Sequence, residues 1–377
     1  MLKIPKWPIA TTQELKLIRE VLESNQWGGW NEIVARFERE FAAFQHCAFG
    51  VSAANGTLAL EMAMEAAGIG PGDEVIVPAI SFISTATAVS RAGATPVFVD
   101  IEPYSFNIDP ERVATAVSPR TKAILPVHFG GPPADMDRLM ALAADCGLMV
   151  IEDAAHAHGS EWNGRRAGSF GLASAFSFQN GKVMTSGEGG ILLTNDAELA
   201  ERARSFANQG RRTGEGFFHH FTLASNFRLS ALQAAVLVAQ LERLPAQIEL
   251  RRRNEQILRQ QLGELEGLRW QQVPPQVSTH SHYLLLGRID ENRFGRSRDE
   301  FCRALIEKGV PCTPFYPHTL YQNPLYRQGG CRVEPCPVAE ACIRDAFWIP
   351  HRVLMADEET ICEIASIIRD LCARQSS

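Results

Sequence analysis

The sequence predicts an α/β fold in which helices cover a mostly parallel central sheet, followed by a small C-terminal α+β unit. The main observation is that short apolar runs alternate with helical patterns between Val51 and Asn195. Strands joined by connections of helix length run parallel and are covered on both faces. The second observation is a change of pattern after Asp196, where long amphipathic helices replace the alternation.

The predicted strands of the large sheet are short apolar runs, each followed by a polar residue or a turn. They cover Glu74–Pro78, Pro96–Asp100, Lys122–Pro126, Leu148–Glu152, Ala173–Phe178 and Gly190–Thr194. Leu58–Ala67, which precedes these strands, is predicted as a helix because it is rich in Ala, Leu, Met and Glu, and helical stretches such as Asp135–Ala144 lie between the strands.

The later part of the chain begins with two predicted helices, Leu229–Leu244 and Gln247–Leu262, separated at Pro245. Proline lacks the N–H group that a helix interior needs, and its ring clashes with the preceding turn. One strand and two helices are predicted beyond them, at His282–Ile289, Arg298–Lys308 and Glu358–Ala373. We therefore expect a large domain over residues 1–245, whose N-terminal segment contributes to the active site. A linking helix and a small domain follow over residues 246–377.

The composition predicts a cytoplasmic protein that needs neither a metal nor disulfides. The formal net charge is −6 and no segment is strongly basic, which argues against nucleic acid as a partner. The nine cysteines form no CxxC pair and have no spacing typical of zinc. The first residues lack the apolar core of a signal peptide, and no apolar run reaches the roughly 18 residues that a membrane span requires.

The strongest local signal is a lysine in a glycine-rich loop. Lys182 follows the predicted strand Ala173–Phe178, and the loop continues to Gly190. A lysine that forms a Schiff base needs such a place, because it must reach a cofactor from a rigid edge and be partly desolvated. A single loop lysine is usually only a solvated charge, so the assignment depends on its neighbours.

Two neighbours favour a site at the carboxyl edge of the sheet, where ligands of α/β proteins bind. Asp153 follows the apolar run that begins at Leu148, and a carboxylate there can keep a pyridinium nitrogen protonated. Its structural alternative is a helix cap. His156 lies three residues further on and can touch the same ring, or it is simply a hydrogen-bonded, half-buried histidine.

A phosphate site is predicted where a helix starts. Asn55, Gly56 and Thr57 open the predicted helix, and free N–H groups at a helix start attract phosphate. Ser177 offers a second hydroxyl, although Asn and Thr are also common caps. Phe82 can stack on an aromatic cofactor, with core packing as its alternative.

The order of the motifs resembles the sugar aminotransferase family (DegT/DnrJ/EryC1/StrS type) of fold-type-I pyridoxal-phosphate enzymes. The matching segments run in family order over about residues 25–245, and the C-terminal part matches more loosely. They are Ser52–Leu60, Gly70–Pro78, Pro96–Ile101, Asn107–Asp109, Thr121–His128, Pro133–Asp137, Ile151–Gly159, Ser177–Gly190 and Ser225–Arg228. The sequence around Lys182 and His351 is similar to that of 3-amino-5-hydroxybenzoate synthases and scyllo-inosose aminotransferases.

The resemblance implies a role for each matching residue. Lys182 would bind pyridoxal 5′-phosphate as an internal aldimine and shuttle a proton, Asp153 would pair with the pyridinium nitrogen, and His156 would lie beside the cofactor. Phe82 would stack on the ring, while the phosphate would be held by Asn55, Gly56, Thr57, Ser177 and, from a neighbouring subunit, Asn226. Substrate contacts would come from Trp27, Gly28, Gly29, Tyr316, His318 and His351.

The resemblance therefore implies a homodimeric transaminase with shared active sites, which moves an amino group from glutamate or glutamine to a keto-sugar or keto-cyclitol. Such an enzyme would serve amino-sugar, aminocyclitol or antibiotic biosynthesis. Three alternatives stay open. They are an aromatising lyase of the 3-amino-5-hydroxybenzoate synthase type, a non-catalytic relative that binds the cofactor or a sugar, and a sugar-nucleotide-binding module. Ala231 and the segment His128–Gly131 depart from the usual family pattern and leave the ring substrate undecided.

Overall fold

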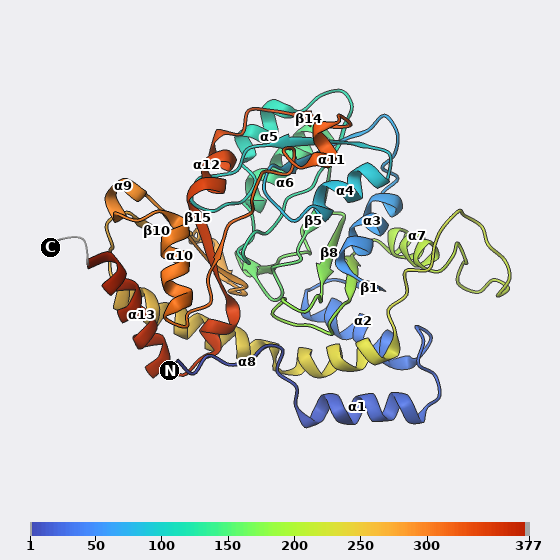
Figure 1. Cartoon of the computed structure of the whole chain (residues 1–377). Coiled ribbons are helices and arrows are strands. Elements are labelled where there is room, and N and C mark those ends of the chain that lie inside the picture. The colour runs from blue at the N-terminus through green and yellow to red at the C-terminus, as the bar shows by residue number, and fades with distance from the viewer. Residues whose placement is uncertain (1, 374–377) are drawn as a thin grey trace.

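The computed structural model describes residues 2–373 and is built around an eight-stranded sheet (Figure 1). The strand order is β1-β9-β8-β5-β4-β2-β3-β14. All neighbours are parallel except β9, which runs antiparallel to β1 and β8, so the predicted mostly parallel sheet is confirmed. The strands are β1 (Phe49–Ala53), β2 (Glu74–Pro78), β3 (Thr95–Val99), β4 (Thr121–Ile124), β5 (Met149–Asp153), β8 (Ala173–Ser177), β9 (Gly190–Thr194) and β14 (Arg332–Val333).

Helices cover both faces of this sheet because successive strand residues point to opposite sides. On β2, Val75 and Val77 pack in the core beneath one helical layer, and Ile76 packs beneath the other. The first layer consists of α3 (Gly56–Ala66), α4 (Ser84–Arg91) and α7 (Ala197–Ala207). The second consists of α2 (Glu32–Phe44), α5 (Pro110–Ala116), α6 (Met136–Cys146) and the first half of α8 (Ala231–Leu262).

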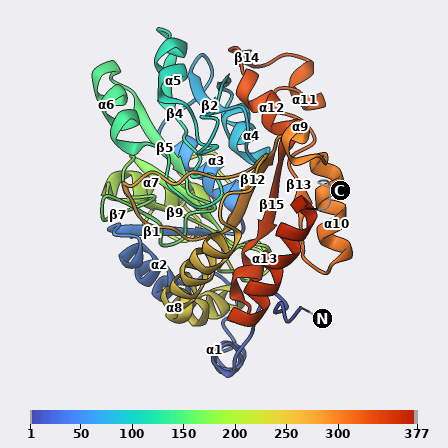
Figure 2. The ribbon, with the colours of Figure 1, turned by 90° about the vertical axis from the view of Figure 1, so that its left-hand side faces the viewer.

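A second, antiparallel sheet of four strands has a core of its own. Its order is β10-β12-β15-β13, and Phe301, Phe347 and Ile361 lie fully buried among its helices. Figure 2 shows α13 beside α8 at this end of the molecule. The elements are β10 (Leu268–Trp270), β12 (Leu284–Ile289), β13 (Thr313–Pro314), β15 (Ala346–Pro350), α9 (Glu291–Phe294), α10 (Arg298–Glu307) and α13 (Glu358–Ala373).

The remaining elements lie around these two sheets. They are α1 (Thr12–Glu23), α11 (Pro324–Arg327), α12 (Pro337–Asp345), the 3-10 helix η1 (His351–Met355), and a small sheet of β6 (Glu161–Trp162), β7 (Arg165–Arg166) and β11 (Val277–Thr279). Because β14 returns to the large sheet, the chain crosses the predicted boundary more than once. The division at residue 245 stays a proposal. Within residues 2–373, no helix is both long and apolar enough to cross a bilayer.

The predicted break at Pro245 is wrong, because α8 runs without interruption from Ala231 to Leu262. The first half of α8 buries Leu244 and Ile248 against the large sheet, and the second half buries Leu258 and Leu262 in the small core. Packing at both ends offsets the single hydrogen bond that the proline removes.

The end of β5 carries two buried carboxylates that point to opposite faces. Glu152 accepts hydrogen bonds from the N–H groups of Gly168, Phe170 and Gly171 at 2.6–2.8 Å. It also accepts one from His128 Nε2 at 2.9 Å, since His128 Nδ1 accepts from the Ala134 N–H. Glu152 is fully buried within the protein, whereas its neighbour Asp153 faces the carboxyl edge of the sheet. The alternation of the strand thus separates a structural carboxylate from one that faces the candidate site.

We predict that Glu152→Ala lowers the free energy of unfolding by about 3–5 kcal/mol, because it leaves several buried donors without an acceptor. Glu152→Gln should lose less, since its amide oxygen can still accept. Urea denaturation of the cofactor-free protein measures both, with the exposed Glu264→Ala as the control. Equal midpoints for Glu152→Ala and Glu264→Ala would contradict this role.

Candidate active site

The structure places Lys182 beside Asp153, His156 and two tyrosines at the carboxyl edge of β5 and β8. The Lys182 Nζ atom lies 4.7 Å from the ring centre of Tyr283, which the small-sheet part of the chain supplies. Burial lowers the pKa of Lys182 from 10.5 to about 8, and the nearby charge of Asp153 opposes part of that change. At pH 7 about a tenth of this lysine is therefore a free amine, far more than at its ordinary pKa, and the free amine is the form that a nucleophile requires.

Among residues 2–373, no cationic side chain donates a hydrogen bond to the buried carboxylate of Asp153. Its Oδ2 accepts from the Thr85 hydroxyl at 2.7 Å, and its Oδ1 accepts from the Ala155 N–H at 3.2 Å. Burial raises the pKa of Asp153, although these hydrogen bonds and the charge of Lys182 oppose the change. A protonated ring nitrogen would supply the missing positive partner, which fits the predicted role.

His156 lies between two aromatic rings. Its ring centre is 4.4 Å from that of Tyr283 and 5.5 Å from that of Phe129. Burial holds the pKa of His156 well below its usual value, so the ring is neutral. Its Nδ1 accepts from the Gly130 N–H at 3.3 Å, which leaves the proton on Nε2 as a donor.

The predicted phosphate site forms where α3 begins next to the end of β8. Asn55 caps α3 by accepting from the Leu58 N–H at 3.0 Å. A Cβ atom added to Gly56 would lie 2.7 Å from the Ser177 Cβ, so only glycine lets these two segments approach this closely. Thr57 Oγ1 lies 2.7 Å from the hydroxyl of Ser84. The helix start and these hydroxyls form a cradle suited to a phosphate.

Phe82 is 60% exposed, which excludes the alternative of core packing and leaves its ring free to stack on a ligand. The positions of the remaining predicted residues therefore fit pyridoxal phosphate. Gly56 and Ser177 would hold its phosphate, Asp153 would face its ring nitrogen, and Lys182 would lie at its reactive carbon.

The predicted substrate residues divide into two groups. Tyr316 packs against Phe129 and Trp348, and burial together with the nearby Tyr283 and Asp153 raises its pKa, so it belongs to this site. His351 Nε2 lies 3.2 Å from the carbonyl oxygen of Gly181, next to Lys182. His318 contacts the carbonyl oxygen of its neighbour Thr319 at 3.1 Å.

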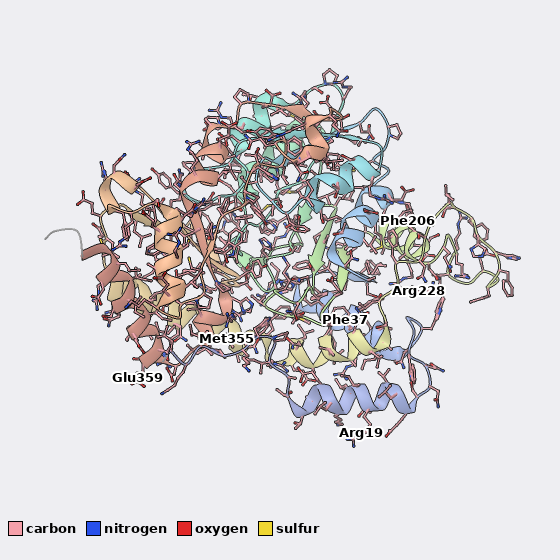
Figure 3. The ribbon with its side chains drawn as sticks, in the orientation of Figure 1. Arg19, Phe37, Phe206, Arg228, Met355 and Glu359 are labelled. Carbon is pink, nitrogen blue, oxygen red and sulfur yellow. The ribbon has the colours of Figure 1, made fainter. Side chains whose placement is uncertain are left out.

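The second group lies away from Lys182 within one chain. The backbone of Trp27 accepts from the Ala231 N–H at 2.9 Å, and a Cβ on Gly29 would lie 3.0 Å from that of Arg228. Gly28 lies between them, and Gly29 lines a cleft of about 490 Å³ beside Arg204 and Arg228. Figure 3 shows Arg228 at the base of the projecting loop. Asn226 is exposed nearby, and its Oδ1 accepts from the Arg228 N–H at 3.3 Å.

Sequence reasoning missed three residues of the site. Tyr283 contacts both Lys182 and His156, Thr85 donates to Asp153, and Trp7 donates to the loop that carries Lys182. Thr85 follows Phe82 closely and could have been found from that position. Trp7 and Tyr283 carry no local signal, because only the tertiary fold brings them to the lysine.

The fold and this set of side chains define a pyridoxal-phosphate-dependent transferase of fold type I. A model of the DegT/DnrJ/EryC1/StrS aminotransferase family matches residues 8–369. The chain therefore belongs to that family, and pyridoxal phosphate is its cofactor.

The chain is similar to two characterised kinds of enzyme. It is 40% identical over 384 aligned residues to the 3-amino-5-hydroxybenzoate synthase of Amycolatopsis mediterranei (strain S699), covering 99% of this chain and 98% of that relative. It is 37% identical over 402 residues to the L-glutamine:2-deoxy-scyllo-inosose aminotransferase of Streptoalloteichus tenebrarius, covering 97% and 93%. A crystal structure of 3-amino-5-hydroxybenzoic acid synthase superposes with a TM-score of 0.93 at 40% identity, covering 99% of both chains.

The lowered pKa of Lys182 predicts how fast the cofactor-free protein takes up pyridoxal phosphate. Because the free amine attacks, the rate of covalent attachment should rise with pH and level off above about 8 rather than above 10.5. Since the charge of Asp153 raises this pKa, Asp153→Asn should move the midpoint to lower pH. Stopped-flow absorbance measures both, and a rate that still climbs at pH 10 would contradict the burial of this amine.

Proposed function

We propose that the protein is an aminotransferase that moves an amino group from glutamate or glutamine to the ring ketone of a sugar or cyclitol. The observation that carries the proposal is the position of Lys182 near Asp153 in one buried site. Burial there lowers the pKa of the amine and raises the pKa of the carboxylate. Relatives with glutamine and scyllo-inosose in their names support the substrate class.

Each residue then has one task. When bound, the cofactor accepts the amino group of the donor and passes it to the ketone, whose oxygen leaves as water. The carboxylate of Asp153 would keep the ring nitrogen of the cofactor protonated. Lys182 would hold the cofactor through its Nζ and move a proton with the same atom. His156 Nε2 would donate a hydrogen bond to the cofactor, and Phe82 would stack on its ring.

The aromatising lyase is the second candidate, and one observation favours it. The 40% identity to a 3-amino-5-hydroxybenzoate synthase extends over 99% of the chain, including the region around Lys182. Both reactions need the same lysine and carboxylate. They differ in whether the amine stays on a saturated ring or water leaves to form an aromatic one.

A non-catalytic relative or a sugar-nucleotide-binding module would not need Lys182 and Asp153 in this arrangement. The buried amine has a lowered pKa, which is costly for stability and useful for chemistry. A binding module would also keep its affinity for ligand in Lys182→Ala.

The proposed reaction can be tested in two halves. L-Glutamine or L-glutamate added to the loaded enzyme should convert its cofactor to pyridoxamine phosphate in a single turnover, and a panel of keto-cyclitols and keto-sugars should then return it to the aldehyde form. Lys182→Ala should abolish both halves while leaving the fold intact. Water loss with appearance of an aromatic product, and no pyridoxamine phosphate, would support the lyase instead.

We further propose that two copies of the chain share their active sites. The segment between α7 and α8, residues 208–226, projects from the body as an arm (Figure 1), closed at its base by a backbone bridge between Asn208 and Asn226. Its exposed apolar side chains, with Leu223 97% exposed, need a covering surface. They are Phe217, Phe218, Phe221 and Leu223.

A second chain fits this surface because the arm carries Asn226, the residue expected to reach the phosphate of a neighbour. Trp27 and Trp30 are also exposed and lie beside the base of the arm. The predicted substrate residues of the segment Trp27–Gly29 would then border the site of the partner. A cytoplasmic location is proposed along with this assembly, and the nine cysteines as free thiols support it.

Mixed dimers test the sharing of sites. If each site takes Lys182 from one chain and Asn226 from the other, a dimer of Lys182→Ala with Asn226→Ala has one site with both defects and one sound site. Such heterodimers, purified through two different tags, should recover about half of the wild-type activity, while each parent homodimer stays impaired. Activity no higher than that of the Asn226→Ala parent would show that the sites are separate.

A further inference from the structure

The loop that carries Lys182 is held by the two ends of the chain. The indole N–H of Trp7 donates to the carbonyl oxygen of Asn180 at 3.1 Å. His351 Nε2 donates to the carbonyl oxygen of Gly181 at 3.2 Å. These are the two carbonyl groups immediately before the lysine. Each donor is distant in the sequence, with a separation of 173 positions for Trp7 and 170 for His351.

The same side chains contact each other and the lysine. The rings of Trp7 and His351 meet edge to face with centres 4.6 Å apart, and those of His351 and Tyr283 stack at 6.1 Å. Tyr283 in turn lies beneath the Lys182 Nζ at 4.7 Å. A continuous series of rings therefore leads from the N-terminal segment to the reactive amine.

The donors are themselves fixed. Burial holds the pKa of His351 well below its usual value, so the ring is neutral, and the carbonyl partner requires the proton on Nε2. The segment around Trp7 is attached to the small core through Leu2 and Ile4. Arg352 Nη1 also donates to the carbonyl oxygen of Pro5 at 3.4 Å.

The turn before Lys182 has few contacts of its own, whereas Val183 and Met184, which follow the lysine, are fully buried in the core. The Gly181 N–H bonds to the Gln179 side chain at 2.7 Å, and the Lys182 N–H bonds to the Gln179 carbonyl at 2.9 Å. These contacts form one turn, and they leave the carbonyl groups of residues 180 and 181 to outside partners. A lysine side chain has a flexible four-carbon stem, so the direction of its amine depends on a fixed backbone.

We propose that Trp7, His351 and Tyr283 act as a clamp that positions the Lys182 amine for attack on the cofactor aldehyde. The inference rests on the proposed role of Lys182 and goes beyond it, since it assigns positioning roles to residues at both ends of the chain. It also moves His351 from the predicted substrate contacts to the support of the lysine loop. The clamp connects the small sheet to the large sheet at the loop that carries Lys182.

The test separates positioning from binding. In cofactor-free protein, the rate constant of covalent attachment of pyridoxal phosphate to Lys182 is measured by absorbance and confirmed by borohydride trapping and peptide mapping. The affinity for pyridoxamine phosphate, which lacks the aldehyde, is measured separately by calorimetry. Trp7→Phe keeps the ring and removes one hydrogen bond, so attachment should slow about fivefold. His351→Leu and Tyr283→Leu should slow it by tenfold or more. The affinity for pyridoxamine phosphate should stay within about twofold of wild type.

Conservative variants and a matched control complete the design. His351→Gln can still donate to the Gly181 carbonyl and should recover much of the attachment rate that His351→Leu loses. Tyr283→Phe keeps the ring beneath the amine and should recover much of the attachment rate that Tyr283→Leu loses. Trp270→Phe changes a tryptophan on β10, away from the lysine loop, and should leave the rate unchanged. Near-wild-type attachment rates in Trp7→Phe and His351→Leu would overturn the clamp, as would a parallel loss of pyridoxamine phosphate affinity. Failure of the wild-type protein to label at Lys182 would instead overturn the proposed role of that lysine.

Discussion

The chemistry of this site depends on burying a lysine amine without giving it a full ion pair. An isolated ammonium group in a protein interior is unfavourable, so the amine loses its proton more easily and its pKa falls to about 8. If Asp153 formed a direct salt bridge with Lys182, the charged form would be restored and the nucleophile lost. Instead Thr85 and a backbone N–H hold the carboxylate, so its influence on the amine acts through space. Two titratable groups perturbed in opposite directions within one pocket are typical of catalytic pairs.

The large sheet makes this arrangement possible because it fixes both partners on neighbouring strands. Asp153 ends β5, Lys182 follows β8, and these strands pair in parallel so that their carboxyl ends meet at one edge. Glu152 secures the same strand end from the opposite face by binding three backbone N–H groups and His128. The functional carboxylate therefore occupies a backbone position that the structural carboxylate beside it makes rigid.

The sequence was sufficient for features with local causes. Apolar runs between glycines and polar turns located six of the eight strands of the large sheet, all but β1 and β14, and the predicted end of β5 placed Asp153 correctly at its edge. The prediction that the helix breaks at Pro245 was wrong because packing against both sheets offsets the local free-energy cost of the proline. His282, with a φ of +54°, delays the start of β12 to Leu284, and no residue type signals that conformation there. Trp7 and Tyr283 were missed for a related reason, since their contacts with the lysine loop exist only after the chain ends have folded against the sheet.

The polarity of the lining supports a ring with several hydroxyl groups as the substrate. Burial raises the pKa of Tyr283 to about 12 and raises that of Tyr316 as well, so both phenols keep their protons. A neutral phenol can donate to one hydroxyl and accept from another, which suits a polyol better than an ion. The aromatic faces of Tyr283 and Tyr316 are flat apolar surfaces of the kind that cover the C–H faces of a ring, and the fully buried Phe129 packs against Tyr316 from the core. Positive charge lies instead on the arm and at its base. Arg211 and Arg212 on the arm pack over phenylalanine rings, and Arg228 at its base lies near Trp30. The groups around Lys182 therefore suit an uncharged ring ketone. An anionic substituent on that ring would depend on the arginines that an adjoining subunit brings to the site.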